Sequence, residues 1–450
     1  MSDSVVLFVT VAAFLATVVL VLWRPKGINE AFFAAGGAAV VLAAGSVSWA
    51  DLGHITVTVS GAAITIIATI VMAIVLESIG FFYWAAEGLA ARARGSGIRL
   101  FWLVNLLCFL MTLFFNNDGS ILITTPILII LLRNLGIKPH QQVPYLLSGA
   151  LVATASSAPI GVSNVVNLIS LKMIGMDLFL NTQLMFVPAM LGLLFMTAVI
   201  YLVIGHQLPR TLLRSRHVRI DPFHHPLKRS PEDPPAHNEQ RMIRILLFVL
   251  LIRLGLFAAS YFGIPIEYVA VAGSLILLGW RWQALGVPPY DIIKKTPWHI
   301  FAFAFSMYVV IMGLNNIGLT EWMIELLRPY VTASLAHAGF IMGGLLTFMS
   351  TLFNNHPALM IGTLTLTGMS LDTNTLYVTY LATVIGSDIG ALLLPIGTLA
   401  SLIWLHLLRQ YRIKVGWRQY MRITFVVIPP TLIFTLLCLH IWTSYVLGMK

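Results

Sequence analysis

Long apolar stretches recur along this chain, and they constrain its fold more than any other feature. Clear examples are residues 5 to 23, 31 to 50, 61 to 83, 182 to 204 and 421 to 444. A helix of about 20 apolar residues can cross the hydrocarbon core of a bilayer. With 58% hydrophobic and 10% charged residues, the chain has more apolar surface than a water-soluble core can bury. We therefore expect an all-α, polytopic membrane protein.

The charge and the cysteines exclude several other classes. The formal net charge is +10, but the Lys and Arg residues lie between the apolar stretches, which does not indicate a nucleic-acid partner. Cys108 and Cys438 lie far apart within apolar stretches, so they form neither a disulfide framework nor a metal-ligand pattern. We expect no metal site and no cofactor.

The chain contains an internal duplication. Matched landmarks recur at separations of 236 to 238 residues. They pair Ile79-Gly80 with Ile317-Gly318, Phe115-Asn116-Asn117 with Phe353-Asn354-Asn355, and Pro159-Ile160-Gly161 with Pro395-Ile396-Gly397. This spacing predicts a first repeat at residues 1 to 205, a polar linker at 206 to 241, and a second repeat at 242 to 450.

The Lys and Arg residues predict the orientation, because they are enriched in cytoplasmic loops. A cytoplasmic linker places 23 of them on that side and only Lys172, Arg328 and Lys450 outside. This bias holds only if residues 98 to 133 enter and leave on one side, as a re-entrant hairpin. The second hairpin, 334 to 371, then enters from the opposite face, and both termini lie outside the cytoplasmic membrane.

An apolar segment interrupted by a polar patch follows each hairpin. These broken helices are predicted at 143 to 170 and at 375 to 408, with patches around Ser156–Asn164 and Ser387–Thr398. Inverted repeats with broken helices at mid-membrane are typical of secondary transporters. We expect two inverted-topology repeats, with about 10 transmembrane helices, two re-entrant hairpins and two broken helices.

The two hairpin tips and the two polar patches are four breaks in the helical structure. Together these four breaks predict the binding site. Main-chain N–H and C=O groups left unpaired at membrane depth are costly unless protein, water or a ligand satisfies them. We expect the breaks to converge on one polar cavity, although the Asn residues are also favoured simply as helix caps. The candidate substrate-binding residues are Asn116, Asn117, Gly119, Ser156, Ser157, Ser163, Asn164, Asn354, Asn355 and Thr398.

Three ionisable residues are candidates for proton coupling: Asp118, Asp388 and His356. A carboxylate within a membrane segment is costly and indicates a function by default. A histidine titrates near neutral pH. Helix capping or helix pairing is the alternative role for the two aspartates, and a hydrogen bond to the backbone at the hairpin tip is the alternative for His356.

The residues at the breaks favour a neutral hydroxylated solute. None of the four breaks contains Lys or Arg, which an anion site usually shows, and neither cysteine lies in a break. Amides, hydroxyls and helix ends suit a small hydroxylated acid that is recognised through hydrogen bonds.

At these residues the sequence resembles the arsenite efflux permeases, the arsenical-pump membrane proteins of the ion-transporter superfamily. The resemblance covers nearly the whole chain and is carried by Phe115–Gly119 with Thr125-Pro126-Ile127, Pro159–Asn167, Phe353–Pro357, and Ile385–Gly390 with Pro395–Ala400. It implies export of As(III) and Sb(III) as neutral hydroxides by proton antiport, in some systems alongside a soluble ATPase. Ala391 and Thr154 depart from the family pattern, in which charged residues occur nearby.

Other functions of the same superfamily remain open at this point. A sodium/proton antiporter or an exporter of silicate or another small oxyacid is the alternative. We expect no enzymatic activity, because the chain has neither a His-Glu-x-x-His nor a Gly-x-Ser-x-Gly motif.

Overall fold

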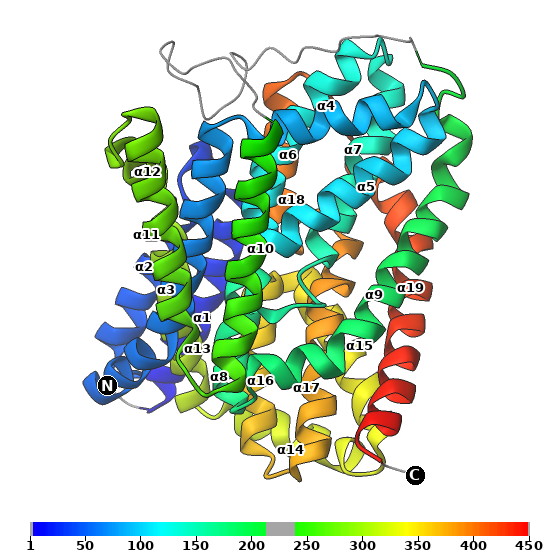
Figure 1. Cartoon of the computed structure of the whole chain (residues 1–450). Helices are drawn as coiled ribbons and strands as arrows, with labels where there is room; N and C mark the ends of the chain where they lie inside the picture. The colour runs from blue at the N-terminus through cyan, green and yellow to red at the C-terminus, as the bar shows by residue number, and fades with distance from the viewer. Residues whose placement is uncertain (1–2, 213–238, 449–450) are drawn as a thin grey trace.

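The computed structural model describes residues 3–212 and 239–448. Within these ranges the chain forms helices and loops, and no β-strand beyond one isolated bridge between Ser96 and Thr211. Nine of the described helices are long and apolar enough to cross a membrane. The predicted all-α polytopic fold is therefore confirmed (Figure 1). Most of the predicted linker, 206 to 241, lies outside the described residues.

Two series of helices follow each other along the chain. The first consists of α1 (Asp3–Trp23), α2 (Glu30–Ala44), α3 (Trp49–Ser78), α4 (Phe81–Ala93), α5 (Gly97–Phe114), α6 (Asn117–Asn134), α7 (Pro139–Ala155), α8 (Val165–Ile174) and α9 (Leu178–Ile204), with short 3₁₀ turns at Pro25–Gly27, Gly161–Ser163 and Gly205–Gln207. The second consists of α10 (Glu239–Tyr261), α11 (Ile266–Leu285), α12 (Tyr290–Lys295), α13 (His299–Asn316), α14 (Leu319–Val331), α15 (Leu335–Phe353), α16 (Asn355–Gly368), α17 (Thr373–Asp388), α18 (Leu399–Gln410) and α19 (Trp417–Val446), with a 3₁₀ turn at Gly390–Leu393.

The two series run in the same order, apart from the added short helix α12. One pair of sequence landmarks has a clear structural reason. Gly80 before α4 and Gly318 before α14 both have left-handed backbone angles, with φ of 78° and 93°. Glycine adopts this conformation without steric cost. The repeat boundaries at 205 and 242 remain a prediction, which the shared order supports.

Each series contains one helical hairpin and one broken helix. Helices α5 and α6 meet at Phe115 and Asn116, whereas α15 and α16 meet at Asn354. Helix α4, which leads into the first hairpin, lies at the upper end of Figure 1, and α14, which leads into the second, lies at the lower end. The broken helices are α7 with α8 and α17 with α18.

The two series interlock. Helix α6 of the first hairpin packs on α18 of the second broken helix, and α16 of the second hairpin packs on α8 of the first. The helices before the hairpins follow the same exchange, because α2 packs on α13 and α3 packs on α11. Each series therefore completes the packing of the other, as expected for two related units joined face to face.

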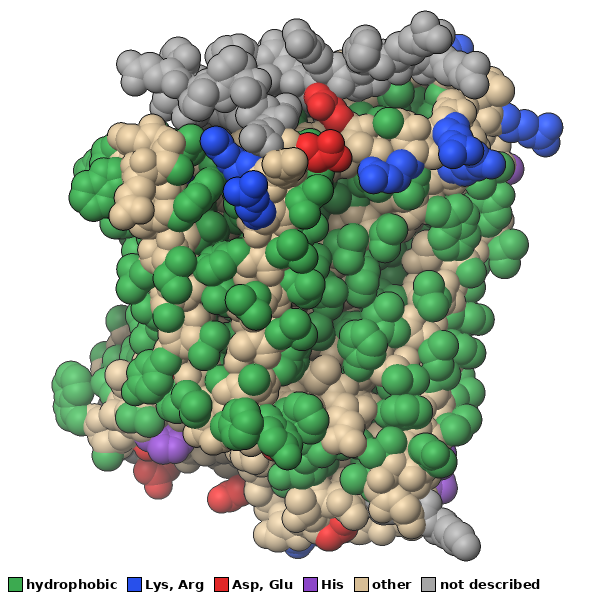
Figure 2. Space-filling model, viewed as in Figure 1, with side chains coloured by type: hydrophobic (Ala, Val, Ile, Leu, Met, Phe, Trp, Pro, Cys, Tyr) green, Lys and Arg blue, Asp and Glu red, His purple; other side chains and the backbone are tan. Residues whose placement is uncertain are grey.

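The outer surface matches a lipid environment. Phe32, Val57 and Leu202 expose 74%, 76% and 78% of their surface, which is costly in water but not in hydrocarbon. Figure 2 shows a largely hydrophobic middle, with Lys and Arg gathered at the upper end of this face. Helix α1 begins and α19 ends at the opposite end (Figure 1). This arrangement supports the predicted orientation.

Glycine allows α15 and α17 to pack closely, next to the second broken helix. A Cβ atom at Gly386 would overlap the main-chain carbonyl group of Gly343, which belongs to α15 and has no room to move. Thr347 Oγ1 of α15 donates to the carbonyl of Gly343 at 2.8 Å and lies 3.4 Å from the carbonyl oxygen of Gly386. The close contact between the main chains of α15 and α17 thus holds Gly386, two residues before Asp388, in place.

We expect Gly386→Ala to lower the free energy of unfolding by about 1–3 kcal/mol or more, because overpacking forces the two helices apart. Thermal unfolding of the purified protein in detergent measures this effect. Gly344→Ala is the matched control on α15, since no atom lies within 4 Å of its added Cβ. Equal unfolding temperatures for the two variants would contradict the close packing described here.

Candidate functional site

Asp388 lies at the end of α17, where it receives hydrogen bonds from the other series. Its side chain is buried, and its two carboxylate oxygens accept from Asn167 Nδ2 at 2.7 Å, Ser157 Oγ at 2.8 Å and Asn164 Nδ2 at 3.4 Å. All three donors belong to the first broken helix or to its break. The two breaks therefore meet at this one carboxylate.

The local sequence explains how the first break presents these donors. Helix α7 ends at Ala155, and the hydroxyls of Ser156 and Ser157 donate back to carbonyls of its last turn. Asn164 caps α8, because its Oδ1 accepts from the N–H of Val166 at 3.2 Å. The amide nitrogen of Asn164 then points toward Asp388.

Ser157 lies between two acceptors. Its Oγ is 2.8 Å from Asp388 Oδ2 and 2.8 Å from the carbonyl oxygen of Thr154. A hydroxyl has a single hydrogen to donate. Ser157 can satisfy both contacts at once only if Asp388 carries a proton and donates it to Ser157 Oγ. The hydrogen bonds around Asp388 therefore depend on its protonation state.

The hairpin tips are held by asparagine caps. Asn116 Oδ1 accepts from the N–H of Gly119 at 3.0 Å, and Asn117 Oδ1 accepts from the N–H of Asp118 at 2.9 Å. In the second hairpin Asn354 Oδ1 accepts from the N–H of His356 at 3.3 Å. Capping is thus one role of these side chains, as the alternative interpretation of the sequence had it.

The second hairpin is tied to its own broken helix. The N–H of Asn355 donates to the carbonyl of Gly397 at 2.9 Å, and Asn354 Nδ2 donates to that of Ile396 at 3.4 Å. Thr398 caps α18, because its Oγ1 accepts from the N–H of Ser401 at 3.0 Å. Of the predicted residues, this region brings together Asn354, Asn355 and Thr398.

Several buried polar atoms near the breaks have no protein hydrogen-bond partner within the described ranges. Four of them are Ser163 Oγ, Asn167 Oδ1, Asn355 Oδ1 and His356 Nδ1. The ring of His356 lies beside that of Phe303, with centroids 5.4 Å apart. Buried polar atoms are nearly always hydrogen-bonded, so these four are candidates for contact with a solute or water.

Asp118 occupies a different setting from Asp388. It lines a cavity of about 430 Å³ together with Gly119, the ion-paired Arg24 and Glu30, His299 and His406. The lining also includes Lys295 at the end of α12, and α12 lies at the upper end of Figure 1. The cavity therefore joins the basic end of the molecule to the first hairpin tip.

Arg253 lies at the first hairpin tip, although it is not among the candidate site residues predicted from the sequence. Its guanidinium reaches from α10 to the first hairpin and donates to the carbonyls of Phe114, at 2.7 Å from Nε, and of Phe115, at 2.5 Å from Nη2. The breaks themselves contain no Lys or Arg, but a cation from another helix does lie at one of them. A buried arginine in an apolar helix was the available signal.

Asn167 is the second residue missing from the predicted set. It makes the shortest of the hydrogen bonds to Asp388, at 2.7 Å, and Tyr380 donates to its main-chain carbonyl at 3.1 Å. The side chain lies on α8, outside the polar patch that drew attention in the sequence. Its position one turn after the cap Asn164 places both amides on one face of the helix.

The cysteines lie away from this cluster. Cys108 is buried where α5, α6 and α7 pack together. Its Sγ lies against Gly149 of α7, and the side chains of Val104 and Leu128 lie against the same glycine. Within residues 3–212 and 239–448, no three His, Cys, Asp or Glu side chains gather as metal ligands would.

Comparison with known proteins agrees with the membrane-transporter architecture. A model of the arsenical pump membrane protein family matches residues 9–443. The chain belongs to this family. A Bacillus subtilis (strain 168) protein, provisionally named an arsenical pump membrane protein, is 56% identical over 442 residues. The match covers 96% of this chain and 99% of that protein. An arsenical pump membrane protein of Escherichia coli is 32% identical over 437 residues, covering 97% and 99%.

A solved structure has the same overall fold. The Alcanivorax borkumensis YdaH transporter, described as having an unusual topology, superposes with a TM-score of 0.51 at 14% identity. The match covers 89% of this chain and 90% of the other. Family and fold together identify the chain as a multi-pass membrane transporter.

Asn354 has a backbone conformation that only glycine adopts readily, with φ of 77° and ψ of 151°. We expect Asn354→Gly to lose the cap but relieve this strain, whereas Asn354→Ala loses the cap and keeps the strain. The alanine variant should be the less stable of the two by about 1–3 kcal/mol. Denaturation of both variants under identical detergent conditions tests this order, and the reverse order would contradict the strained tip.

Proposed function

We propose that this protein is a secondary transporter that exports As(III) and Sb(III) as neutral hydroxides across the cytoplasmic membrane by proton antiport. The observation that carries the proposal is the buried Asp388, which is shared between the breaks of the two series. Family membership supports the arsenical substrate. A buried carboxylate at the junction of two interlocked units supports coupling between proton binding and rearrangement.

The substrate chemistry follows from the polar atoms at the breaks. A trihydroxide such as arsenous acid both donates and accepts hydrogen bonds, and it carries no charge that requires a counter-ion. Ser163 Oγ, Asn167 Oδ1 and Asn355 Oδ1 offer buried hydroxyl and carbonyl oxygens without protein partners. We therefore propose recognition of the hydroxide shell, rather than thiolate ligation, with the predicted set of Asn, Ser, Gly and Thr residues around it.

Proton coupling is proposed to act through Ser157. With Asp388 protonated, the carboxylic acid donates to Ser157 while Ser157 donates to Thr154, so both contacts of this hydroxyl are satisfied. With Asp388 ionised, Ser157 turns toward the carboxylate, and the carbonyl of Thr154 loses that donor. Protonation thus changes the hydrogen bonds that join the two series. Asp118 and His356 remain the proposed further proton carriers.

The entry route is proposed to be the cavity that reaches Asp118 from the basic end of the molecule. If this end faces the cytoplasm, as the Lys and Arg distribution predicts, the solute enters from inside the cell. The positive end of α6 lies next to Asp118 at the bottom of the cavity. The proton gradient supplies the energy in this mechanism, so a soluble ATPase would add to the antiport and is not required by it.

The groups around Asp388 favour a proton over a sodium ion. Its three neighbours present N–H and O–H donors, which suit a carboxylate or carboxylic acid. A bound sodium ion instead needs several oxygen lone pairs directed at it, as hard cations do generally. Silicic acid shares the hydroxyl chemistry of arsenous acid, and the transport assay below separates the two.

Uptake into everted membrane vesicles with an acidic lumen tests the proposal. We expect the wild type to accumulate As(III), and we expect Asp118→Asn and Asp388→Asn to lose accumulation driven by the pH gradient, because neither amide can carry the proton. Asp177→Asn is the matched control. It makes the same change at an exposed cap of α9, where asparagine caps as well as aspartate.

Two outcomes would count against the proposal. Movement of sodium or silicate, with no accumulation of As(III) by the wild type, would exclude the substrate. Full gradient-driven uptake by both site variants, at control levels of protein in the membrane, would exclude the two aspartates as proton carriers.

A further inference from the structure

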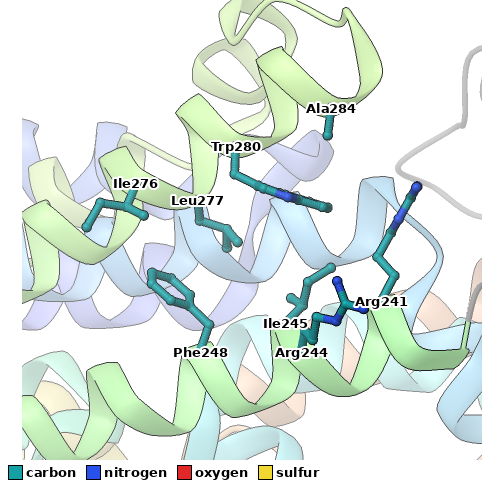
Figure 3. Close-up of a pocket in the computed structure, with 8 residues that line it drawn as sticks. All are labelled: Arg241, Arg244, Ile245, Phe248, Ile276, Leu277, Trp280 and Ala284. Atoms are coloured by element: carbon teal, nitrogen blue, oxygen red, sulfur yellow. The ribbon is translucent and has the colours of Figure 1, made fainter.

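A second pocket lies between α10 and α11, away from the breaks. It has a volume of about 420 Å³, and the described residues that line it come from these two helices (Figure 3). Arg241 and Arg244 come from the first turns of α10, and Trp280 comes from α11. The remaining lining residues are Ile245, Phe248, Ile276, Leu277 and Ala284.

The two arginines give the pocket one cationic end. Neither has an ion-pair partner among the residues that the structure describes. The nearby Arg281 points elsewhere, because its guanidinium binds both carboxylate oxygens of Asp291 at 2.9 and 2.8 Å. That carboxylate is therefore already engaged, and Arg241 and Arg244 remain available to an anion from outside the protein.

The other end of the pocket is apolar. Phe248 follows Arg244 by four residues, or about 6 Å along the helix, and faces Leu277 and Ile276 of α11 (Figure 3). The indole of Trp280 extends from α11 toward α10 between the two ends. Two cations at the end of a membrane helix, followed after one turn by apolar side chains, match the order of groups in a phospholipid.

The depth of the pocket also fits a lipid. Figure 2 shows Lys and Arg at the upper end of the molecule, directly above the hydrophobic band. Tryptophan is enriched at this boundary between head groups and hydrocarbon. Leu251 and Leu275, further along the same two helices, expose 64% and 61% of their surface. Acyl chains leaving the pocket therefore continue over an apolar surface.

We propose that this pocket binds one anionic phospholipid. Arg241 and Arg244 hold the phosphate and its negative head group, and the acyl chains lie along Phe248, Ile276 and Leu277. Basic pockets between transmembrane helices bind anionic head groups in this way. The inference depends on the membrane-spanning fold and is independent of the transported substrate.

Native mass spectrometry of the full chain in detergent tests the proposal, with dioleoylphosphatidylglycerol and dioleoylphosphatidylcholine added separately. We expect one tightly retained phosphatidylglycerol and no equivalent retention of phosphatidylcholine. The double variant Arg241→Gln/Arg244→Gln should bind phosphatidylglycerol about 30-fold more weakly, from about one charge interaction per arginine. Ala284→Trp keeps both charges but fills the pocket, and it should also lose the lipid.

Arg418→Gln/Arg422→Gln is the matched control, since it removes two exposed arginines near the start of α19. The proposal is overturned if this control weakens binding as much as the pocket variant does, or if Ala284→Trp retains the lipid, since binding then needs only surface charge. Equal retention of phosphatidylcholine would overturn the preference for an anionic head group. A change of oligomeric state without a change in lipid retention would assign the pocket to a second copy of the chain.

Discussion

The structure depends on one constraint: main-chain groups at an interrupted helix inside a membrane must find partners within the protein. Side-chain caps bind N–H groups at the start of each helix that follows a hairpin tip or a break. The caps of α6, α8, α16 and α18 are Asn116, Asn164, Asn354 and Thr398. The carbonyl groups at the breaks need donors as well, and these come partly from the break itself and partly from other helices.

Several of these donors come from distant helices, and some of them cross between the two series. Arg253 of α10 donates to the end of α5, and Tyr420 and Thr424 of α19 donate to the carbonyls of Leu392 and Leu393 in the second break. Asp388 in turn receives its donors from the first series. The first hairpin tip and the second broken helix are therefore stabilised by residues that lie outside them, and a movement of one helix changes the hydrogen bonding of another.

The sequence was sufficient for the helical fold, because apolar length and matched landmarks depend on local patterns. The capping residues were also predictable, since Asn and Thr at a break have a preferred local role. The contacts of Arg253 were not predictable. Its partners are main-chain carbonyls about 138 residues away, and every residue has such a carbonyl, so no residue type indicates the partner. Asn167 meets Asp388 across 221 residues, a contact set by how α8 meets α17. The six-residue helix α12 is too short for a periodic signal.

The position of Arg253 has a consequence for biosynthesis. The first hairpin is complete in sequence by Asn134, but the arginine that binds its tip carbonyls belongs to α10 and is synthesised only after the whole first series. A nascent chain must therefore hold this hairpin in the membrane with two carbonyl groups still lacking their final donor. Insertion of α10 is then the step that completes the hydrogen bonds of the first hairpin, so the first series does not reach its final form before α10 is made.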